Sequence, residues 1–367
     1  MTAATPGDGT PPAGTVDTTA EDARWHRTRL RVLAGWIAAV VVLVLTAGVP
    51  TDRGTLLLLI LSGLGIRCLG RGWRSFGQVL LDWLPFTAAL IAYDYSRGLA
   101  RVVDLPLHMA DVADVDRSVF GVIPTVWLQE HLLDPGVPHW YDAVATLVYV
   151  THFLATPVVA VALWLWSRRV WLQFITRVIG LAVAGVVTYV LFPAAPPWYA
   201  SEEGVIGPVL RGTSRGWLWL HVGKAGNLLQ EGQIASNPVA AMPSLHTAYA
   251  TVISLFVLML LGRARRPWVR RARWLVLLYP VLMGISLVYL GEHYVVDLVA
   301  GVGYALGVHL AARWWERRRD ARRAAADGLD QDRVTTTSAS GQRVAAGAPV
   351  TRDNDGSSGT DGTGVAV

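Results

Sequence analysis

Residues 140–166 read WYDAVATLVYVTHFLATPVVAVALWLW, a run of 27 residues with a single carboxylate and no lysine or arginine. A helix of about 20 mostly apolar residues is enough to cross the roughly 30 Å of hydrocarbon in a bilayer. Because this run is longer than that, we predict that it spans a membrane as a helix.

The rest of the chain has the same character. Of its 367 residues, 53% are hydrophobic and 16% are charged, whereas an ordinary soluble domain is about 25% charged. These values exclude an ordinary soluble domain and, more firmly, a disordered protein. The expected fold is all-α, a polytopic membrane helix bundle of about eight transmembrane helices. The other seven predicted spans are residues 30–49, 55–69, 76–97, 170–191, 244–261, 274–290 and 295–314.

The spans fall into two groups separated by polar segments. Residues 24–75 hold two N-terminal transmembrane helices, and residues 76–315 hold the other six. Between the spans, short surface helices are expected at 112–120 and 125–133, and residues 193–243 form a long polar loop.

Both ends of the chain differ from this pattern. Residues 1–23 and 327–367 are rich in Gly, Thr and Asp and have no apolar periodicity. Such segments cannot bury enough apolar area to offset the entropy of ordering. We therefore predict that both tails are disordered.

The basic residues indicate a topology. With the N-terminus in the cytoplasm, 24 of the 32 lysines and arginines lie in cytoplasmic segments, seven lie on the other face, and Arg177 lies within a span. Positive residues concentrate on the cytoplasmic side of membrane proteins. We expect both termini to be cytoplasmic and the 193–243 loop to lie outside. The net charge of +5 is then a topological signal, and no nucleic-acid partner is expected.

The first polar cluster at membrane depth is Ala-Met-Pro-Ser-Leu-His, residues 241–246, directly before an apolar span. Ser244 is a good N-cap, and the free N–H groups of a helix start attract anions. His246 lies in the first turn, next to such an anion site. A capped helix start with an interfacial histidine is the alternative interpretation.

The second cluster is Gly-Glu-His-Tyr-Val-Val-Asp, residues 291–297, at the start of the last span. His293 and Asp297 are four residues apart, so they lie on one helical face. The carboxylate can fix the tautomer of the imidazole and leave Nε2 free as a nucleophile or base. Two alternatives are a buried pair that joins two helices and a zinc site. No further ligand with the usual spacing is evident, so no metal is predicted.

Together these residues carry a family resemblance. Pro-Ser-Leu-His at 243–246, His-x-x-x-Asp at 293–297 and Phe-Pro-Ala-Ala-Pro-Pro-Trp at 192–198 resemble motifs of the type 2 phosphatidic acid phosphatase superfamily, in its inositol phosphorylceramide synthase-like branch. The resemblance covers about two thirds of the chain. It implies that residues 76–315 form a six-helix phosphatase-like core.

The resemblance also implies an activity on the extracytoplasmic side. It assigns His293 as the nucleophile that forms a phosphohistidine, Asp297 as the group that orients it, His246 as the acid that protonates the leaving oxygen, and Ser244 as a phosphate-binding residue. The substrate is then a phospholipid or lipid phosphate drawn from the bilayer, and no cofactor or metal is needed. Hydrolysis and inositol-phosphate-type headgroup transfer both fit these residues.

The sequence departs from the superfamily in its phosphate-binding cations. The Lys and Arg-Pro of the first motif are absent, and Ser286-Leu287 replaces the Ser-Arg of the third. Other cations must therefore bind phosphate, unless they are ordinary solvated charges. Our candidates are Arg97 with its neighbour Asp94, followed by Arg211, Arg215 and Lys224.

A lipid-binding protein or transporter is the competing function. In it the His293–Asp297 pair relays protons or closes a gate. Transporters often show paired halves or interrupted helices at corresponding positions, and the sequence shows no such symmetry. The sequence makes no prediction of the oligomeric state.

Overall fold

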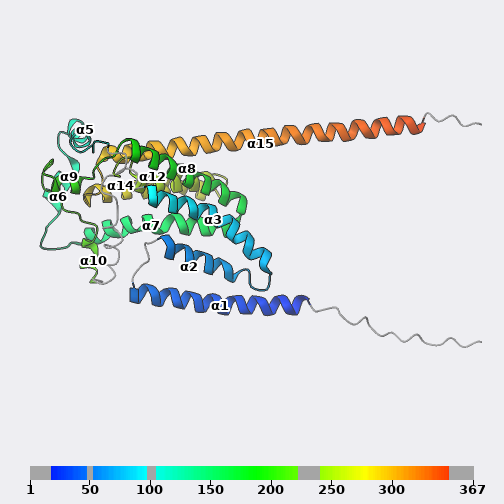
Figure 1. Cartoon of the computed structure of the whole chain (residues 1–367), viewed down its shortest axis with the longest axis horizontal. Coiled ribbons are helices and arrows are strands. Elements are labelled where there is room, and N and C mark those ends of the chain that lie inside the picture. Colours follow the sequence, from blue (N-terminus) through cyan, green and yellow to red (C-terminus); the bar gives the residue numbers. More distant parts are fainter. Residues whose placement is uncertain (1–17, 48–52, 97–104, 222–239, 347–367) are drawn as a thin grey trace, which may run out of the picture. The chain divides into compact units, whose positions relative to one another are not determined.

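The structure is a computed structural model that describes residues 18–47, 53–96, 105–221 and 240–346 (Figure 1). Within these ranges the regular structure is helical, apart from two isolated β-bridges. The helices are α1 (Thr18–Ala47), α2 (Arg53–Ile66), α3 (Trp73–Ser96), α5 (Ala110–Phe120), α6 (Pro124–Leu132), α7 (Trp140–Trp166), α8 (Arg168–Leu191), α9 (Pro197–Glu202), α10 (Arg215–Trp219), α12 (Leu245–Leu261), α13 (Pro267–Ala272), the 3-10 helix η1 (Arg273–Leu277), α14 (Leu278–Tyr289) and α15 (Val295–Ala346).

The predicted all-α polytopic membrane bundle is confirmed. In the described part of the chain, four helices are long and apolar enough to cross a membrane: Trp140–Trp166, Arg168–Leu191, Pro267–Tyr289 and Val295–Ala326. Two shorter apolar helices, Gly54–Ile66 and Leu245–Leu261, accompany them. Helices α1 and α3 coincide with the two other predicted spans, and the count of eight stays a prediction.

The chain divides into two units, Met1–Ala312 and Arg313–Val367. Helix α15 is assigned from Val295 to Ala346, whereas disorder was predicted from residue 327 onward. Alanine and arginine are strong helix formers and extend the helix past the apolar part. The helix α1 likewise begins at Thr18, inside the N-terminal tail that was expected to be disordered.

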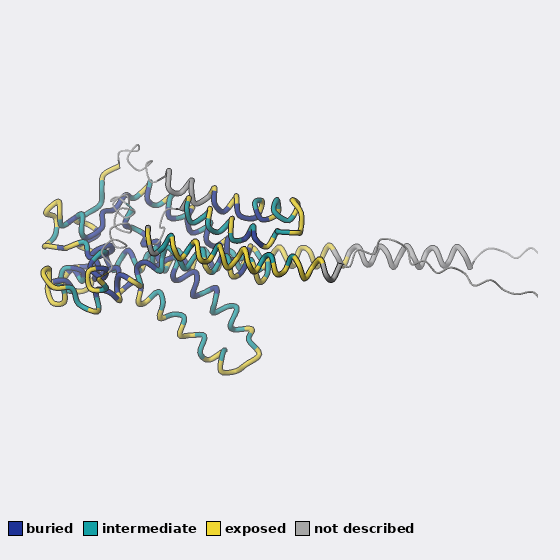
Figure 2. The backbone as a smooth tube through the Cα atoms, turned by 90° about the horizontal axis from the view of Figure 1, so that it is seen from below, coloured by how far each residue is buried: buried dark blue, intermediate teal, exposed yellow. Residues whose placement is uncertain are grey.

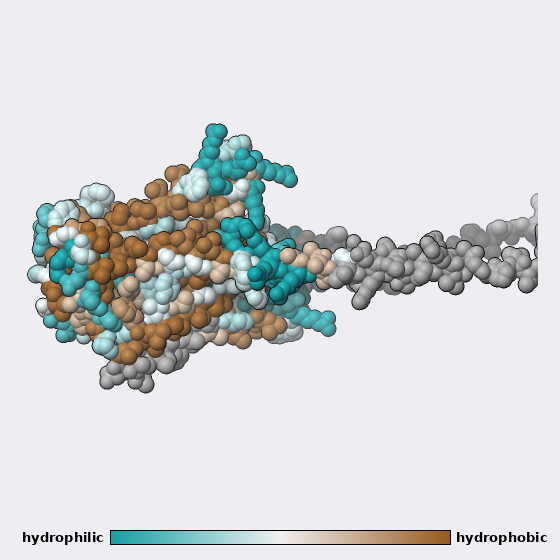
Figure 3. Space-filling model, turned by 90° about the horizontal axis from the view of Figure 1, so that it is seen from above, coloured by the Kyte–Doolittle hydropathy of each residue, from teal (hydrophilic) through white to brown (hydrophobic). Residues whose placement is uncertain are grey.

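Helix α12 lies at the centre of the bundle. It packs against α7, α8 and α14, and its Phe256 is fully buried beside Phe174 of α8. One turn earlier on α8, Trp171 is also fully buried, and its ring centroid lies 5.7 Å from that of the fully buried Trp83 of α3. Figure 2 shows the buried residues concentrated in the interior of the bundle. On the face seen in Figure 3, apolar residues form a belt with hydrophilic residues at its ends, as a bilayer requires.

The span predicted at 274–290 is interrupted near its start. A 3-10 segment, Arg273–Leu277, precedes the α-helix that begins at Leu278. Pro280 has no N–H with which to bond the carbonyl of Val276. That carbonyl instead accepts a 2.8 Å hydrogen bond from the Ser254 hydroxyl of α12. A neighbouring helix thus satisfies the carbonyl that Pro280 leaves without an intrahelical partner.

One end of the bundle carries the short helices. The helices α5 and α6 match the two predicted surface helices, and α9 and α10 lie within the loop predicted at 193–243. The backbone of Ala194 bridges to those of His108 and Ala240. The bridge to Ala240 holds this part of the loop beside the start of α12. The amide of Trp198 donates a 3.1 Å hydrogen bond to the carbonyl of Gly291, in the segment that precedes α15.

Candidate active site

The start of α12 is held by backbone contacts. The Ser244 hydroxyl accepts a 3.4 Å hydrogen bond from the amide of Thr247, which confirms the predicted N-cap. The amide of Ser244 donates to the carbonyl of Asp297 at 3.0 Å. At Gly301 of α15, a Cβ atom would lie 2.4 Å from the Ser244 carbonyl oxygen. Glycine at 301 therefore allows α12 and α15 to approach closely.

Two carboxylates cap the start of α15. Asp297 Oδ2 accepts a 2.9 Å hydrogen bond from the amide of Tyr294. The carboxylate of Asp116, on α5, accepts from the amides of Val295 at 2.8 Å and Val296 at 2.9 Å. A helix start leaves such N–H groups without intrahelical partners. The helix α5 thus holds the segment that carries His293.

The structure brings the two sequence motifs together. His293 Nε2 lies 3.3 Å from His246 Nδ1, and His293 Nδ1 lies 3.4 Å from Asp297 Oδ2. The side chains of His293 and Asp297 are almost completely buried. One nitrogen of His293 thus faces a carboxylate and the other faces a second imidazole. This is the arrangement that an activated histidine nucleophile with an adjacent acid or base requires.

Aromatic rings of α7 form one wall of the site. The His152 ring centroid lies 4.1 Å from that of His246, and the Tyr149 ring stacks on His246 at 5.2 Å. Neither residue was predicted from the sequence as part of the site. One signal was available for His152, because a polar side chain at membrane depth is a candidate functional residue.

Among the loop cations that the structure describes, Arg211 contacts the segment that carries His293. Its Nε donates a 2.7 Å hydrogen bond to Glu292, the residue before His293, and its guanidinium lies 4.6 Å from the Trp198 ring centroid. Burial lowers the pKa of Arg211, but the Glu292 carboxylate, with smaller contributions from Tyr149 and Glu202, raises this pKa above its ordinary value overall. A positive charge is therefore maintained beside the histidines.

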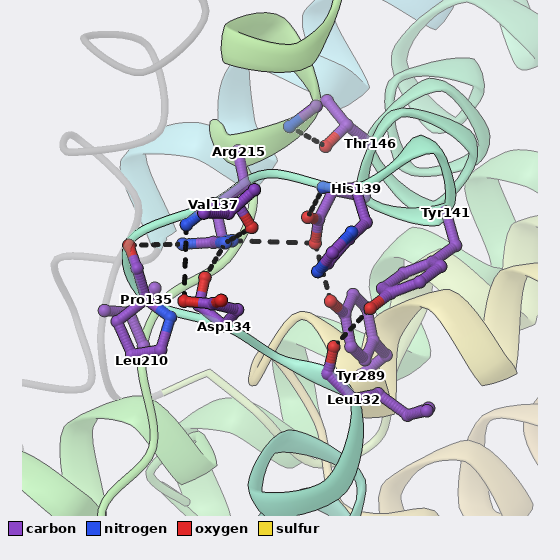
Figure 4. A network of polar contacts seen from close by, with 12 residues as sticks. Leu132, Asp134, Pro135, Val137, His139, Tyr141, Thr146, Leu210, Arg215 and Tyr289 are labelled. Carbon is purple, nitrogen blue, oxygen red and sulfur yellow. Dashed lines mark hydrogen bonds and ion pairs between the residues drawn. The ribbon is translucent and has the colours of Figure 1, made fainter.

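Arg215 has a different role (Figure 4). Its guanidinium donates to the carbonyls of Asp134, Pro135 at 3.3 Å and Val137 at 3.1 Å. Its Nε lies 3.5 Å from Asp142, which in turn accepts a 2.6 Å hydrogen bond from the Tyr289 hydroxyl. The expectation that Arg215 binds phosphate finds no support here, because this buried side chain holds the loop before α7 in place.

The side chains of the three remaining candidates for phosphate binding lie outside the described part of the structure. Asp94 lies in the last part of α3, and its side chain is outside the description. Arg97 and Lys224 lie outside the described residues. Their roles in phosphate binding stay predictions.

The described residues offer no set of ligands for the zinc alternative. Among them, no group of three or more His, Cys, Asp or Glu side chains is arranged to hold a metal ion. Metal independence of the reaction stays a prediction.

The residues of the site lie in a segment that is similar to a known protein family. The family model described as PAP2 superfamily matches residues 110–311, more than half of the chain. That segment contains His246, His293 and Asp297. No solved structure matches the chain at a significant level.

Three known proteins are similar to the chain. A phosphoinositol dihydroceramide synthase of Bacteroides thetaiotaomicron is 27% identical over 245 residues, which are 61% of this chain and 73% of that protein. An inositol phosphorylceramide synthase of Candida albicans is 30% identical over 177 residues, 46% of this chain and 35% of that protein. The inositol phosphorylceramide synthase catalytic subunit of Schizosaccharomyces pombe is 28% identical over 171 residues, 45% of this chain and 38% of that protein. The chain thus spans little more than a third of the two fungal proteins.

Proposed function

Because the chain belongs to the PAP2 superfamily, we propose that this membrane enzyme transfers a phosphoinositol headgroup to a ceramide-type lipid through a phosphohistidine on His293. The convergence of His293, His246 and Asp297 within hydrogen-bonding distance is the observation that carries the proposal. The names of the three relatives support the choice of headgroup and acceptor.

In the first step, His293 Nε2 attacks the phosphorus of phosphatidylinositol. The bond from phosphorus to the diacylglycerol oxygen breaks, and His246 gives its proton to that oxygen. The phosphoinositol group is left on His293. Asp297 keeps the imidazole oriented and stabilises the positive charge that forms on it. Arg211 neutralises charge on the phosphoryl oxygens, which is the main requirement of phosphoryl transfer.

In the second step, the acceptor hydroxyl attacks the same phosphorus. Neutral His246 takes the hydroxyl proton, the N–P bond breaks, and His293 is regenerated. Water in place of the acceptor gives hydrolysis with the same residues. Only the acceptor decides between a phosphatase and a transferase.

The site must open before the first step. A nucleophile and its target atom approach to about 3–3.5 Å, and an acid lies about 2.6–3.2 Å from the oxygen that it protonates. The phosphorus and the leaving oxygen must both lie between the two imidazoles. The 3.3 Å between His293 Nε2 and His246 Nδ1 leaves no room for them. We therefore propose that the substrate separates the two rings when it binds.

The positive-inside bias supports a site on the extracytoplasmic side, with both termini in the cytoplasm.

The test supplies purified protein in detergent with inositol-labelled phosphatidylinositol, dihydroceramide and EDTA. We expect a labelled ceramide-type lipid in equimolar amount to diacylglycerol. His293→Ala and His246→Ala should abolish it, whereas His131→Ala, which changes an exposed histidine of α6, should not. Unchanged product formation by His293→Ala would refute the proposed nucleophile. Free inositol phosphate as the sole labelled product would identify a hydrolase.

A further inference from the structure

A polar cavity lies at the end of the bundle away from the histidines. Its volume is about 490 Å³, and it lies between the α2–α3 turn and the α7–α8 junction. The start of α8 is here, whereas Tyr189 near its other end donates a hydrogen bond to the Pro243 carbonyl beside the active site. The cavity is therefore separated from the active site by nearly the length of α8. Its polar walls include Arg67, Arg71, Gln78, Asp82, Trp164 and Arg168.

One carboxylate lines this cavity, and its charge is already compensated. Arg168 Nε lies 2.9 Å from both oxygens of Asp82, and Arg168 Nη2 lies 2.5 Å from Oδ1. The indole Nε1 of Trp164 donates to the same carboxylate at 3.0 Å. Asp82 is buried, whereas the Arg168 side chain is largely exposed. The pairing leaves little negative charge on Asp82 to meet the other arginines.

Arg67 and Arg71 supply the excess charge. Within the described part of the chain neither forms an ion pair, and Arg67 approaches only the Trp164 ring, at 5.9 Å. Three guanidinium groups and one carboxylate give the cavity two net positive charges. The N-termini of α3 and α8 lie beside it, and a helix N-terminus adds further positive potential.

The apolar rim indicates what kind of anion fits. Val79 and Leu81 of α3 line the same cavity, and Leu81 is largely exposed on the outer surface, where the lipid chains lie. Tryptophan near a helix end is typical of the headgroup region, and Trp164 has this position. An anion here therefore meets guanidinium groups on one side and hydrocarbon on the other. Arginine binds phosphate oxygens in a planar, bidentate manner.

We infer that this cavity binds the phosphate headgroup of an anionic phospholipid, separately from the reaction at the histidines. Topology alone accounts for basic residues at a helix end. It does not account for their arrangement around a cavity that has an apolar rim and whose carboxylate, Asp82, is already paired with Arg168. Arg270 and Arg271 of α13 are exposed on a short helix and do not line the cavity, so they provide a matched comparison.

The test measures lipid binding to the full chain in detergent. The probes are phosphatidylglycerol, phosphatidylcholine and glycerol phosphate, and the readouts are bound lipid by native mass spectrometry and the shift in Tm. We expect phosphatidylglycerol to bind at least about tenfold more tightly than phosphatidylcholine, and its affinity to fall at least about tenfold in the double variant Arg67→Gln/Arg71→Gln. The double variant Arg270→Gln/Arg271→Gln has the same loss of charge and should bind as the wild type does.

Three outcomes would overturn the inference. These are equal binding of the two lipids by the wild type, unchanged binding by Arg67→Gln/Arg71→Gln, and an equal loss in both double variants. Binding of glycerol phosphate as tight as that of phosphatidylglycerol would show a soluble phosphate site and would also overturn the lipid assignment. Under the proposed function the active site also takes an anionic phospholipid, so the comparison of the two double variants locates the binding. The Tm of each variant without lipid checks that it is folded.

Discussion

Arg211 and Arg215 are four residues apart in one loop, and their surroundings predict opposite effects of the same substitution. Lysine keeps the charge but loses the planar fork of donors. A hydrogen bond to a charged group contributes about 1.5–3 kcal/mol. For Arg211→Lys we expect kcat/KM to fall about tenfold or more with a small change in Tm. For Arg215→Lys we expect a lower Tm and near-normal kcat/KM per folded molecule. Steady-state kinetics with thermal unfolding checks both, and the reverse pattern would contradict the assignments.

Asp116 provides a prediction on pH. Burial raises the pKa of its carboxyl above the usual range, and the amides of Val295 and Val296 only partly offset that effect. A raised carboxyl pKa means that the folded state binds the proton more tightly than the unfolded state. The stabilising contribution of Asp116 is then largest at low pH and is lost as pH rises above about 4. We expect the difference in Tm between wild type and Asp116→Asn to shrink between pH 4 and pH 7. A growing difference would contradict this.

At the residue scale, the sequence was sufficient to predict contacts within one motif. It was insufficient to predict which side chains of other helices contact the motif residues. The pairing of His293 with Asp297 follows from helical spacing, and the Ser244 cap follows from residue type. The stacking of Tyr149 and His152 on His246 depends on how α7 packs against α12. The contact between Arg211 and Glu292 depends on a loop path. Neither dependence is encoded in local spacing.

At the scale of helices, the approach of α12 to α15 depends on Gly301. A Cβ atom there would meet the Ser244 carbonyl oxygen at 2.4 Å, whereas nothing lies within 4 Å of one at Gly303. Overpacking costs about 1–3 kcal/mol, and separating these helices displaces His246 from His293. We expect Gly301→Ala to lower the Tm by several degrees and activity at least tenfold. The control Gly303→Ala should be neutral or slightly stabilising. Equal behaviour of both variants in unfolding and turnover assays would refute this explanation.

The helices themselves were largely predictable, because each is long, apolar and bounded by polar residues. The starts of α7 and α15 match the predicted boundaries. The 3-10 segment before α14 was missed because its stability depends on Ser254 of another helix. The extension of α15 to Ala346 was missed because composition alone does not distinguish a solvated helix from a coil.

At the scale of the whole molecule, the orientation in the membrane is the prediction that follows from charge alone. Cys68 is the single cysteine of the chain, so a Cys68→Ala background permits labelling at chosen sites. Glu203, after α9, and Arg265, after α12, are both exposed. In intact cells we expect a membrane-impermeant maleimide to label Glu203→Cys and to label Arg265→Cys only after permeabilisation. The opposite pattern would reverse the proposed topology.

The class of the molecule, an all-α membrane bundle, follows from hydropathy, and the family follows from two short motifs. Cations remote from those motifs were harder to assign, because positive charges at a membrane surface also determine topology. The sequence therefore gave equal weight to Arg211 and Arg215. Packing places one of them beside the histidines and the other in a structural network.

The covalent intermediate is the most direct test of the whole account. Wild-type protein is mixed with phosphatidylinositol carrying radioactive phosphorus, without acceptor, and quenched in alkali, in which a phosphorus–nitrogen bond survives. The account predicts label on the peptide that contains His293, discharge of that label when ceramide is added, and no label in His293→Ala. Label on another residue, or turnover without any labelled protein, would contradict it.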